Sequence, residues 1–249
     1  MYIAALFWVL IGCWCVCRAI HWFPSRLAEE ESFVIVEIIA QQSKDKIPAI
    51  SPVLQPSLVS FFSGQPKIDF RACCYFCAAQ LIAFWAYSHF GLTWDFIFWS
   101  IFGWSLLVLA AVDARTKLLP DALTLPLLWL GIVIQLWPET RTVGLELAVV
   151  GAVAGYLPLW LFAHLYKLIR GRDGLGMGDL KLLAAMGAWS GPFILPHVLL
   201  LAALLAIALF VIERVLRRST AGIHEERPFG PAIVAAYFIV MAFAYSVNP

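Results

Sequence analysis

The sequence predicts an all-α, polytopic integral membrane protein with about eight transmembrane helices and one cytoplasmic loop region. Its composition, its apolar runs and the placement of its basic residues support this prediction. Of the 249 residues, 62% are hydrophobic and 13% are charged, which is about half the charged share of a soluble domain. Eight membrane helices of about 20 residues need roughly 160 positions, close to the apolar content of the chain. A soluble globular protein is therefore disfavoured.

Eight apolar runs follow one another along the chain, and each is predicted to form a helix. They cover residues 2–17, 73–90, 94–112, 118–137, 143–168, 180–189, 194–216 and 232–247. The sixth run is short and is followed by Pro192 and Pro196, so it could instead be a helix that enters the membrane from one side. The first run lacks a basic segment before it, which favours a retained anchor helix over a cleaved signal peptide.

The basic residues predict both the domain organisation and the orientation. All 17 Lys and Arg residues except Arg141 fall in alternate loops, and loops rich in Lys and Arg stay in the cytoplasm. We therefore expect both termini to lie outside. The chain divides into a first transmembrane helix at 1–17, a cytoplasmic loop region at 18–72 and a membrane domain at 73–249. The net charge of +1 disfavours nucleic acid as a partner and leaves the lipid bilayer as the expected one.

The cysteines do not predict a metal site. Cys74 and Cys77 form a single CxxC pair, and residues 18–71 contain no Cys. A structural zinc ion usually takes four ligands. We therefore expect these cysteines to pack as small apolar side chains, and we expect neither zinc nor another metal.

Two acids adjoin apolar runs on the predicted cytoplasmic side. Asp113 follows the third run, and Asp179 precedes the sixth. Ionisable groups at the membrane are costly and tend to be functional. Two carboxylates brought close cannot both ionise easily, so they share a proton and can activate water against an amide. Such a pair could therefore hydrolyse an amide bond.

The neighbours of these acids suggest supporting roles and a simpler alternative. Gly174, Gly176 and Gly178 are expected to allow tight backbone with positive φ just before a helix. Asp179 could instead be only the N-cap of that helix. For Asp121, which follows a proline, the N-cap role is favoured. Lys117 and Lys181 could each pair with a nearby carboxylate, but extension along the membrane edge is favoured for both.

Other hydrolase classes find no support in the sequence. It contains no HExxH zinc-protease motif, no GxSxG nucleophile motif and no phosphate-binding P-loop. Two alternatives from other classes remain open: a small transporter that uses paired acids as a proton relay, and a membrane assembly scaffold without chemistry. Full function after replacement of both acids would favour the scaffold.

Three segments in series resemble the type IV prepilin peptidases, a family of membrane aspartic proteases of the GxGD class. They are DARTKLLPDALTLPLLWLG at 113–131, GLGMGDLKLLAAMGAWSG at 174–191 and RPFGPAI at 227–233. The resemblance implies that Asp113 and Asp179 are catalytic, and that residues 73–249 are the catalytic domain. Matching supporting positions are Gly176, Gly178, Lys181, Asp121, Pro228, Phe229, Gly230 and Pro231.

The resemblance also implies the reaction and its setting. Such enzymes cut the basic leader from prepilins or pseudopilins, the substrates of type IV pilus and type II secretion systems, at the cytoplasmic face of the bacterial inner membrane. Proteolysis needs no cofactor. Many members then N-methylate the new N-terminus with S-adenosylmethionine. Family members often hold zinc on two CxxC pairs in the first cytoplasmic loop. Because residues 18–71 have no Cys, zinc is not expected here, and methyl transfer stays an open alternative.

Overall fold

The computed structural model describes residues 8–20, 70–137, 143–171, 176–217 and 228–247. Within these ranges the chain forms helices and turns and no strand, which confirms the predicted all-helical class. The elements are Trp8–Ile20, α3 (Phe70–Phe90), α4 (Trp94–Thr116), α5 (Asp121–Ile134), α6 (Leu145–Arg170), α7 (Met177–Ser190), the 3-10 helix η2 (Pro192–Ile194), α8 (Leu195–Arg217) and α9 (Gly230–Val247). Most of the predicted loop region, residues 21–69, lies outside the described residues.

Three described helical segments are long and apolar enough to cross a membrane. They are α4, α6 and Pro192–Val215, in which η2 leads into α8. Three shorter apolar helices accompany them: Trp8–Ile20, α5 and the Gly230–Tyr245 part of α9. Helix α7 has 14 residues, about 21 Å at 1.5 Å per residue, so it is shorter than a hydrocarbon core of about 30 Å. The architecture is that of a membrane protein, and helix length alone does not give the number of crossings.

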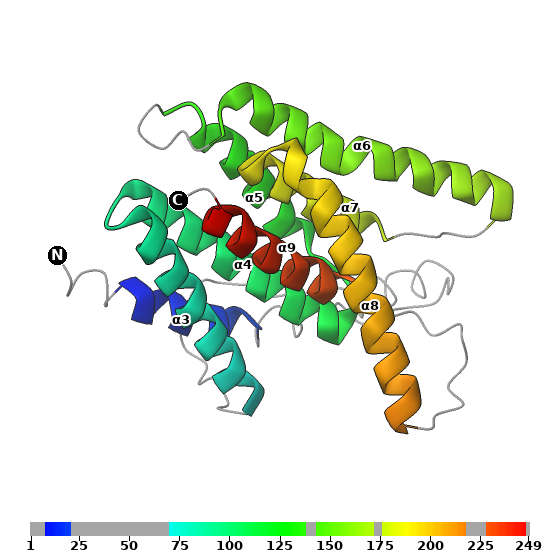
Figure 1. The fold of residues 1–249 in the computed structure, drawn as a ribbon, viewed down its shortest axis with the longest axis horizontal. Coiled ribbons are helices and arrows are strands. Elements are labelled where there is room, and N and C mark those ends of the chain that lie inside the picture. Colours follow the sequence, from blue (N-terminus) through cyan, green and yellow to red (C-terminus); the bar gives the residue numbers. More distant parts are fainter. Residues whose placement is uncertain (1–7, 21–69, 138–142, 172–175, 218–227, 248–249) are drawn as a thin grey trace, which may run out of the picture.

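Helices α7 and α9 occupy central positions (Figure 1). Helix α7 packs against α5 and α6, and α9 packs against α4 and α8. The two groups share one apolar core, because buried side chains of α4, α7 and α9 belong to the same cluster. The cytoplasmic ends predicted for α4 and α7 are therefore parts of one packed body.

An aromatic cluster joins α4, α7 and α9 inside this core. The rings of Phe102 in α4 and Trp189 in α7 stack with centroids 4.4 Å apart, and Tyr237 in α9 packs edge-on against Phe102. The Trp189 indole N–H donates to the Leu127 carbonyl of α5 at 2.9 Å. The Tyr237 hydroxyl, which is buried, hydrogen-bonds Ser190. The Trp189 N–H and the Tyr237 hydroxyl thus each have a hydrogen-bond partner, as burial in an apolar core favours.

Helices α6 and α7 approach each other through glycines. A Cβ on Gly155 would lie 2.5 Å from the Leu183 carbonyl oxygen, and one on Gly151 would overlap the Gly187 carbonyl. Only residues without a side chain allow backbones this close, and small residues are the usual contact points between membrane helices. This packing fixes α7 against the long helix α6.

Two predicted boundaries are wrong. The first helix continues past residue 17 at least to Ile20, the last described residue of this segment, and the Arg115 guanidinium of α4 donates to the Ile20 carbonyl at 3.1 Å. Arg18, assigned to the loop, is instead buried in this helix with its guanidinium over the Trp14 ring. The fourth run forms a regular helix only from Asp121 to Ile134, since residues 117–120 make a separate turn.

Candidate active site

Asp113 lies in the last turn of α4 and is buried, with 4% of its side chain exposed. The Gly230 N–H, at the start of α9, donates to Asp113 Oδ2 at 2.9 Å. A backbone N–H at a helix N-terminus carries partial positive charge and stabilises a carboxylate. Residues 117 positions apart in the chain thus form one polar contact in an otherwise apolar junction.

Asp179 lies in the first turn of α7, ahead of the apolar part of that helix. The N-cap of α7 is Gly176, and no side chain caps the helix. The alternative that Asp179 is only an N-cap is therefore wrong. Burial and, to a smaller extent, the negative charge of Asp113 together raise the pKa of Asp179 to about 7. The two carboxyl groups are close enough to influence each other, which is the arrangement that lets a pair share one proton.

The glycines before Asp179 provide space. The expected positive φ is wrong at Gly176, whose φ is −69°, and Gly178 lies within the helix. A Cβ on Gly176 would lie 3.2 Å from Asp179 Oδ2, and a Cβ on Gly178 would lie 2.8 Å from the Leu119 Cβ. The first glycine leaves room for the carboxylate, and the second lets the link between α4 and α5 contact α7.

Asp121 and Lys181 form an ion pair. The predicted N-cap role of Asp121 is wrong, because Pro120 occupies the N-cap and Asp121 is the first helical residue of α5. The Lys181 ammonium donates to both Asp121 carboxylate oxygens at 2.6 Å. Of the two roles open to Lys181, the structure therefore has the pairing one, and the favoured extension along the membrane edge is wrong.

The PFGP segment, residues 228–231, begins α9. The Phe229 carbonyl accepts from the N–H groups of Ala232 and Ile233, each at 3.1 Å, which closes the first turn. Gly230 is buried, while Pro228, Phe229 and Pro231 are half-buried. A Cβ on Gly230 would lie 2.8 Å from Asp113 Oδ2, so the close contact with the carboxylate depends on a glycine here.

Two residues near the site carried no signal in the sequence. Leu119 is an ordinary apolar residue whose contact with Gly178 follows only from packing. Lys117 adopts a left-handed conformation with φ 57°, the only positive φ at a non-glycine residue in the described ranges. Its N–H donates to the Asp113 carbonyl at 2.8 Å and ends α4. A left-handed residue at this position is usually glycine, so a lysine here does not predict this conformation.

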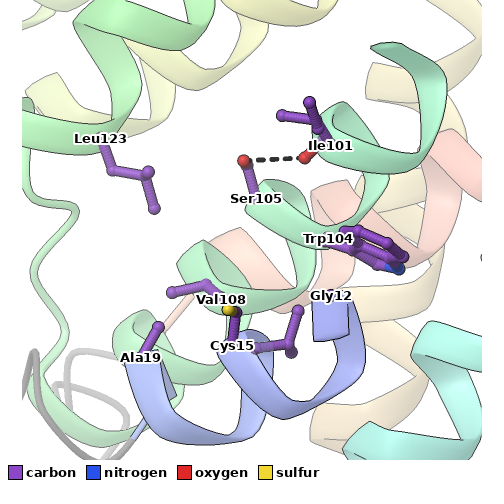
Figure 2. A pocket seen from close by; sticks show the side chains of 9 residues that line it. Gly12, Cys15, Ala19, Ile101, Trp104, Ser105, Val108 and Leu123 are labelled. Atoms are coloured by element: carbon purple, nitrogen blue, oxygen red, sulfur yellow. Dashed lines mark hydrogen bonds between the residues drawn. The ribbon is translucent and has the colours of Figure 1, made fainter. Parts of the chain in front are cut away.

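An apolar groove of about 250 Å³ lies beside the middle of α4 (Figure 2). In Figure 2, Leu123 of α5 lies across the hollow from Val108 of α4 and Ala19 of the first helix. The Ser105 hydroxyl in its wall donates to the Ile101 carbonyl at 2.8 Å. The full lining is Gly12, Cys15, Val16, Ala19, Ile101, Trp104, Ser105, Val108 and Leu123. Such a lining suits apolar chains rather than charged ligands.

Metal ligands do not cluster in the part of the chain that the structure describes. Its His, Cys, Asp and Glu side chains form no group of three or more that could hold an ion. Cys74 and Cys77 are both exposed on α3. The expectation that zinc is absent stays a prediction.

Comparison with known proteins identifies the family. Residues 100–211 match the model of the type IV leader peptidase family, and this range contains both Asp113 and Asp179. This part of the chain belongs to the type IV leader peptidases. The resemblance predicted from three sequence segments is thereby confirmed.

Relatives that match this chain carry the name prepilin leader peptidase/N-methyltransferase. The protein from Pseudomonas aeruginosa is 42% identical over 171 residues, which is 69% of this chain and 58% of the relative. The one from Burkholderia pseudomallei is 47% identical over 53% of this chain and 41% of the relative. The one from Dickeya chrysanthemi is 51% identical over 49% of this chain and 42% of the relative. The chain thus spans about half the length of these relatives. No solved structure matches it.

The contact between Gly230 and Asp113 is testable by adding a single methyl group. In Gly230→Ala the new Cβ would lie 2.8 Å from Asp113 Oδ2, so the carboxylate or the start of α9 must move. We expect any activity that depends on the Asp113 carboxylate to fall by about 10²-fold, the scale of a 1 Å misplacement of a reacting group. The measurement is the rate of that activity at matched protein levels. Ala235→Val, at an exposed position of α9, is the control, and equal activity of both variants would contradict the expectation.

Proposed function

We propose that this protein is a membrane aspartic endopeptidase that removes the leader peptide from type IV prepilins or pseudopilins. The observation that carries the proposal is the proximity of Asp113 and Asp179, two carboxyl groups from different helices, because the charge of Asp113 raises the pKa of Asp179. Both lie within the range that matches the type IV leader peptidases. The names of the relatives supply the substrate class.

The geometry supports a division of roles between the two acids. Asp113 accepts a hydrogen bond from Gly230, which stabilises its ionised form, so Asp113 takes a proton from the attacking water. Asp179, whose pKa is raised to about 7, holds a proton near neutral pH and gives it to the scissile carbonyl oxygen. The water oxygen bonds to the carbonyl carbon. The carbon–nitrogen bond then breaks, the leaving amine departs with the proton that Asp113 accepted, and one hydroxyl proton of the new carboxylic acid returns to Asp179.

The proposed function does not include methyl transfer. The second activity in the relatives' names would need S-adenosylmethionine, which has a positively charged sulfonium and a zwitterionic amino-acid end. The groove in Figure 2 does not fit that molecule, because its lining is apolar and its Ser105 hydroxyl is already bonded to Ile101. The open question of N-methylation therefore rests on residues other than those of the groove.

The first prediction for the proposed activity concerns the pair of Asp113 and Asp179, called the dyad from here on. Asn keeps the size of Asp but cannot exchange the proton, so Asp113→Asn and Asp179→Asn should each lose cleavage by several orders of magnitude. The double variant should be scarcely worse, because residues that act as a unit are non-additive. Immunoblotting of pilin processing at matched enzyme levels measures this. The control is Asp95→Asn, since Asp95 lies at the opposite end of α4. Substantial cleavage by either single variant of the dyad would reject the proposal.

The pH dependence of cleavage follows from the pKa of Asp179. A carboxyl group with its pKa raised to about 7 is protonated below that pH and loses its proton above it. If Asp179 is the proton donor, kcat should fall as pH rises through about 7. The measurement is the single-turnover rate of leader removal across that range. A rate that rises through the same range would assign the proton-accepting role to Asp179 instead.

We further propose that the chain crosses the bacterial inner membrane eight times, with both termini outside and the dyad at the cytoplasmic face. The distribution of Lys and Arg supports this orientation. Reporter fusions at Thr116 and Asp173 should report a cytoplasmic location, and fusions at Gly91 and Thr140 an external one. A cytoplasmic C-terminus in the same assay would contradict the eight-span arrangement.

A further inference from the structure

We propose that the ion pair between Lys181 and Asp121 is a positioning contact of the active site, which holds the first turn of α7 at the separation from α4 that the dyad needs. This inference rests on the proposed function, and it names a role for two side chains that do not touch the reacting groups. Lys181 and Asp121 are positioning residues in this arrangement.

The ion pair connects two helices that the chain brings together from a distance. The Lys181 Nζ lies 2.6 Å from both Asp121 oxygens, and the two residues are 60 positions apart. The side chains are 26% and 55% exposed, respectively. Pairs this exposed contribute little to global stability. The importance of this pair therefore lies in the elements that it joins, the start of α5 and the first turns of α7.

The contacts of α7 with the α4–α5 link, residues 117–120, lie on both sides of Asp179. Gly178, one residue before Asp179, packs against Leu119 of the link. Lys181, two residues after it, binds Asp121, where the link ends and α5 begins. The turn that carries the Asp179 carboxyl group is thus held at two points by one short segment.

The other end of the link is anchored at Asp113. The Lys117 N–H donates to the Asp113 carbonyl at 2.8 Å, and the left-handed conformation of Lys117 turns the chain out of α4. The Thr116 hydroxyl accepts from the Leu118 N–H at 3.3 Å. Only four residues separate α4 from α5. A short, hydrogen-bonded path therefore runs from the backbone of Asp113 to the turn of Asp179.

The functional consequence is control of the distance between the two carboxyl groups. Helix α7 has only 14 residues, and its glycine contacts with α6 lie further along the helix, at Leu183 and Gly187. Near Asp179, the contacts with residues 119 and 121 oppose a rocking of the first turn away from α4. A misplacement of about 1 Å can cost about 10²-fold in rate, so loss of one of these contacts should affect turnover.

The test is a double-mutant cycle on the full chain in lipid vesicles, with a prepilin as substrate. We expect Asp121→Asn and Lys181→Gln each to lower kcat by about tenfold, with KM within about twofold of the unmodified enzyme. The double variant should be no slower than either single one, because both remove the same contact. The charge exchange, Asp121→Lys with Lys181→Asp, should restore most of kcat. Arg170→Gln is the control, since Arg170 is an exposed basic residue at the end of α6.

Several results would overturn the inference. Unchanged kcat in both single variants would mean that the pair has no effect on the dyad. Losses that multiply in the double variant, or a loss confined to KM, would mean that Lys181 or Asp121 acts separately, for example on the basic leader. If the charge-exchanged variant does not accumulate in the membrane, the cycle of Asp121→Asn and Lys181→Gln provides the test on its own. Activity of Asp113→Asn or Asp179→Asn would reject the proposed function itself. If those two variants are inactive while the variants of the ion pair keep full kcat, only this inference is rejected.

Discussion

The burial of Asp113 is the constraint on which the candidate site depends. A carboxylate removed from water costs on the order of several kcal/mol unless nearby groups compensate its charge. At the end of α4 that compensation comes from the Gly230 N–H at the start of α9. The beginning of α9 must therefore lie directly against the end of α4, and the packing of the remaining helices has to permit this contact.

The same contact explains why the site needs small residues. A side chain at position 230 would collide with the Asp113 carboxylate, and one at 178 would collide with Leu119. Further along α7, Gly151 and Gly155 of α6 let the two helices approach until their backbones touch. Helix α7 is thus placed by close backbone contacts along its length. The aromatic stack of Phe102 on Trp189 closes the core between α7 and α4.

The pair of carboxyl groups is asymmetric because its two environments differ. Asp113 is buried too, but it has a backbone N–H donor that favours its ionised form, whereas burial and the charge of its partner both raise the pKa of Asp179. This asymmetry is what acid–base chemistry on an amide requires, since one group must be ready to accept a proton while the other holds one.

The sequence by itself determined the helical class, the candidate acids Asp113 and Asp179 and the family, because apolar runs and motifs are local properties that survive without knowledge of packing. It favoured the wrong role for Lys181 and for Asp121, since an N-cap is the local alternative and the partner of Asp121 lies 60 positions away. It also suggested positive φ at Gly176, where the constraint is space beside the Asp179 carboxylate. Only the tertiary structure decided these points, together with the contact of Gly230 with Asp113, because each depends on two helices whose distance no local pattern encodes.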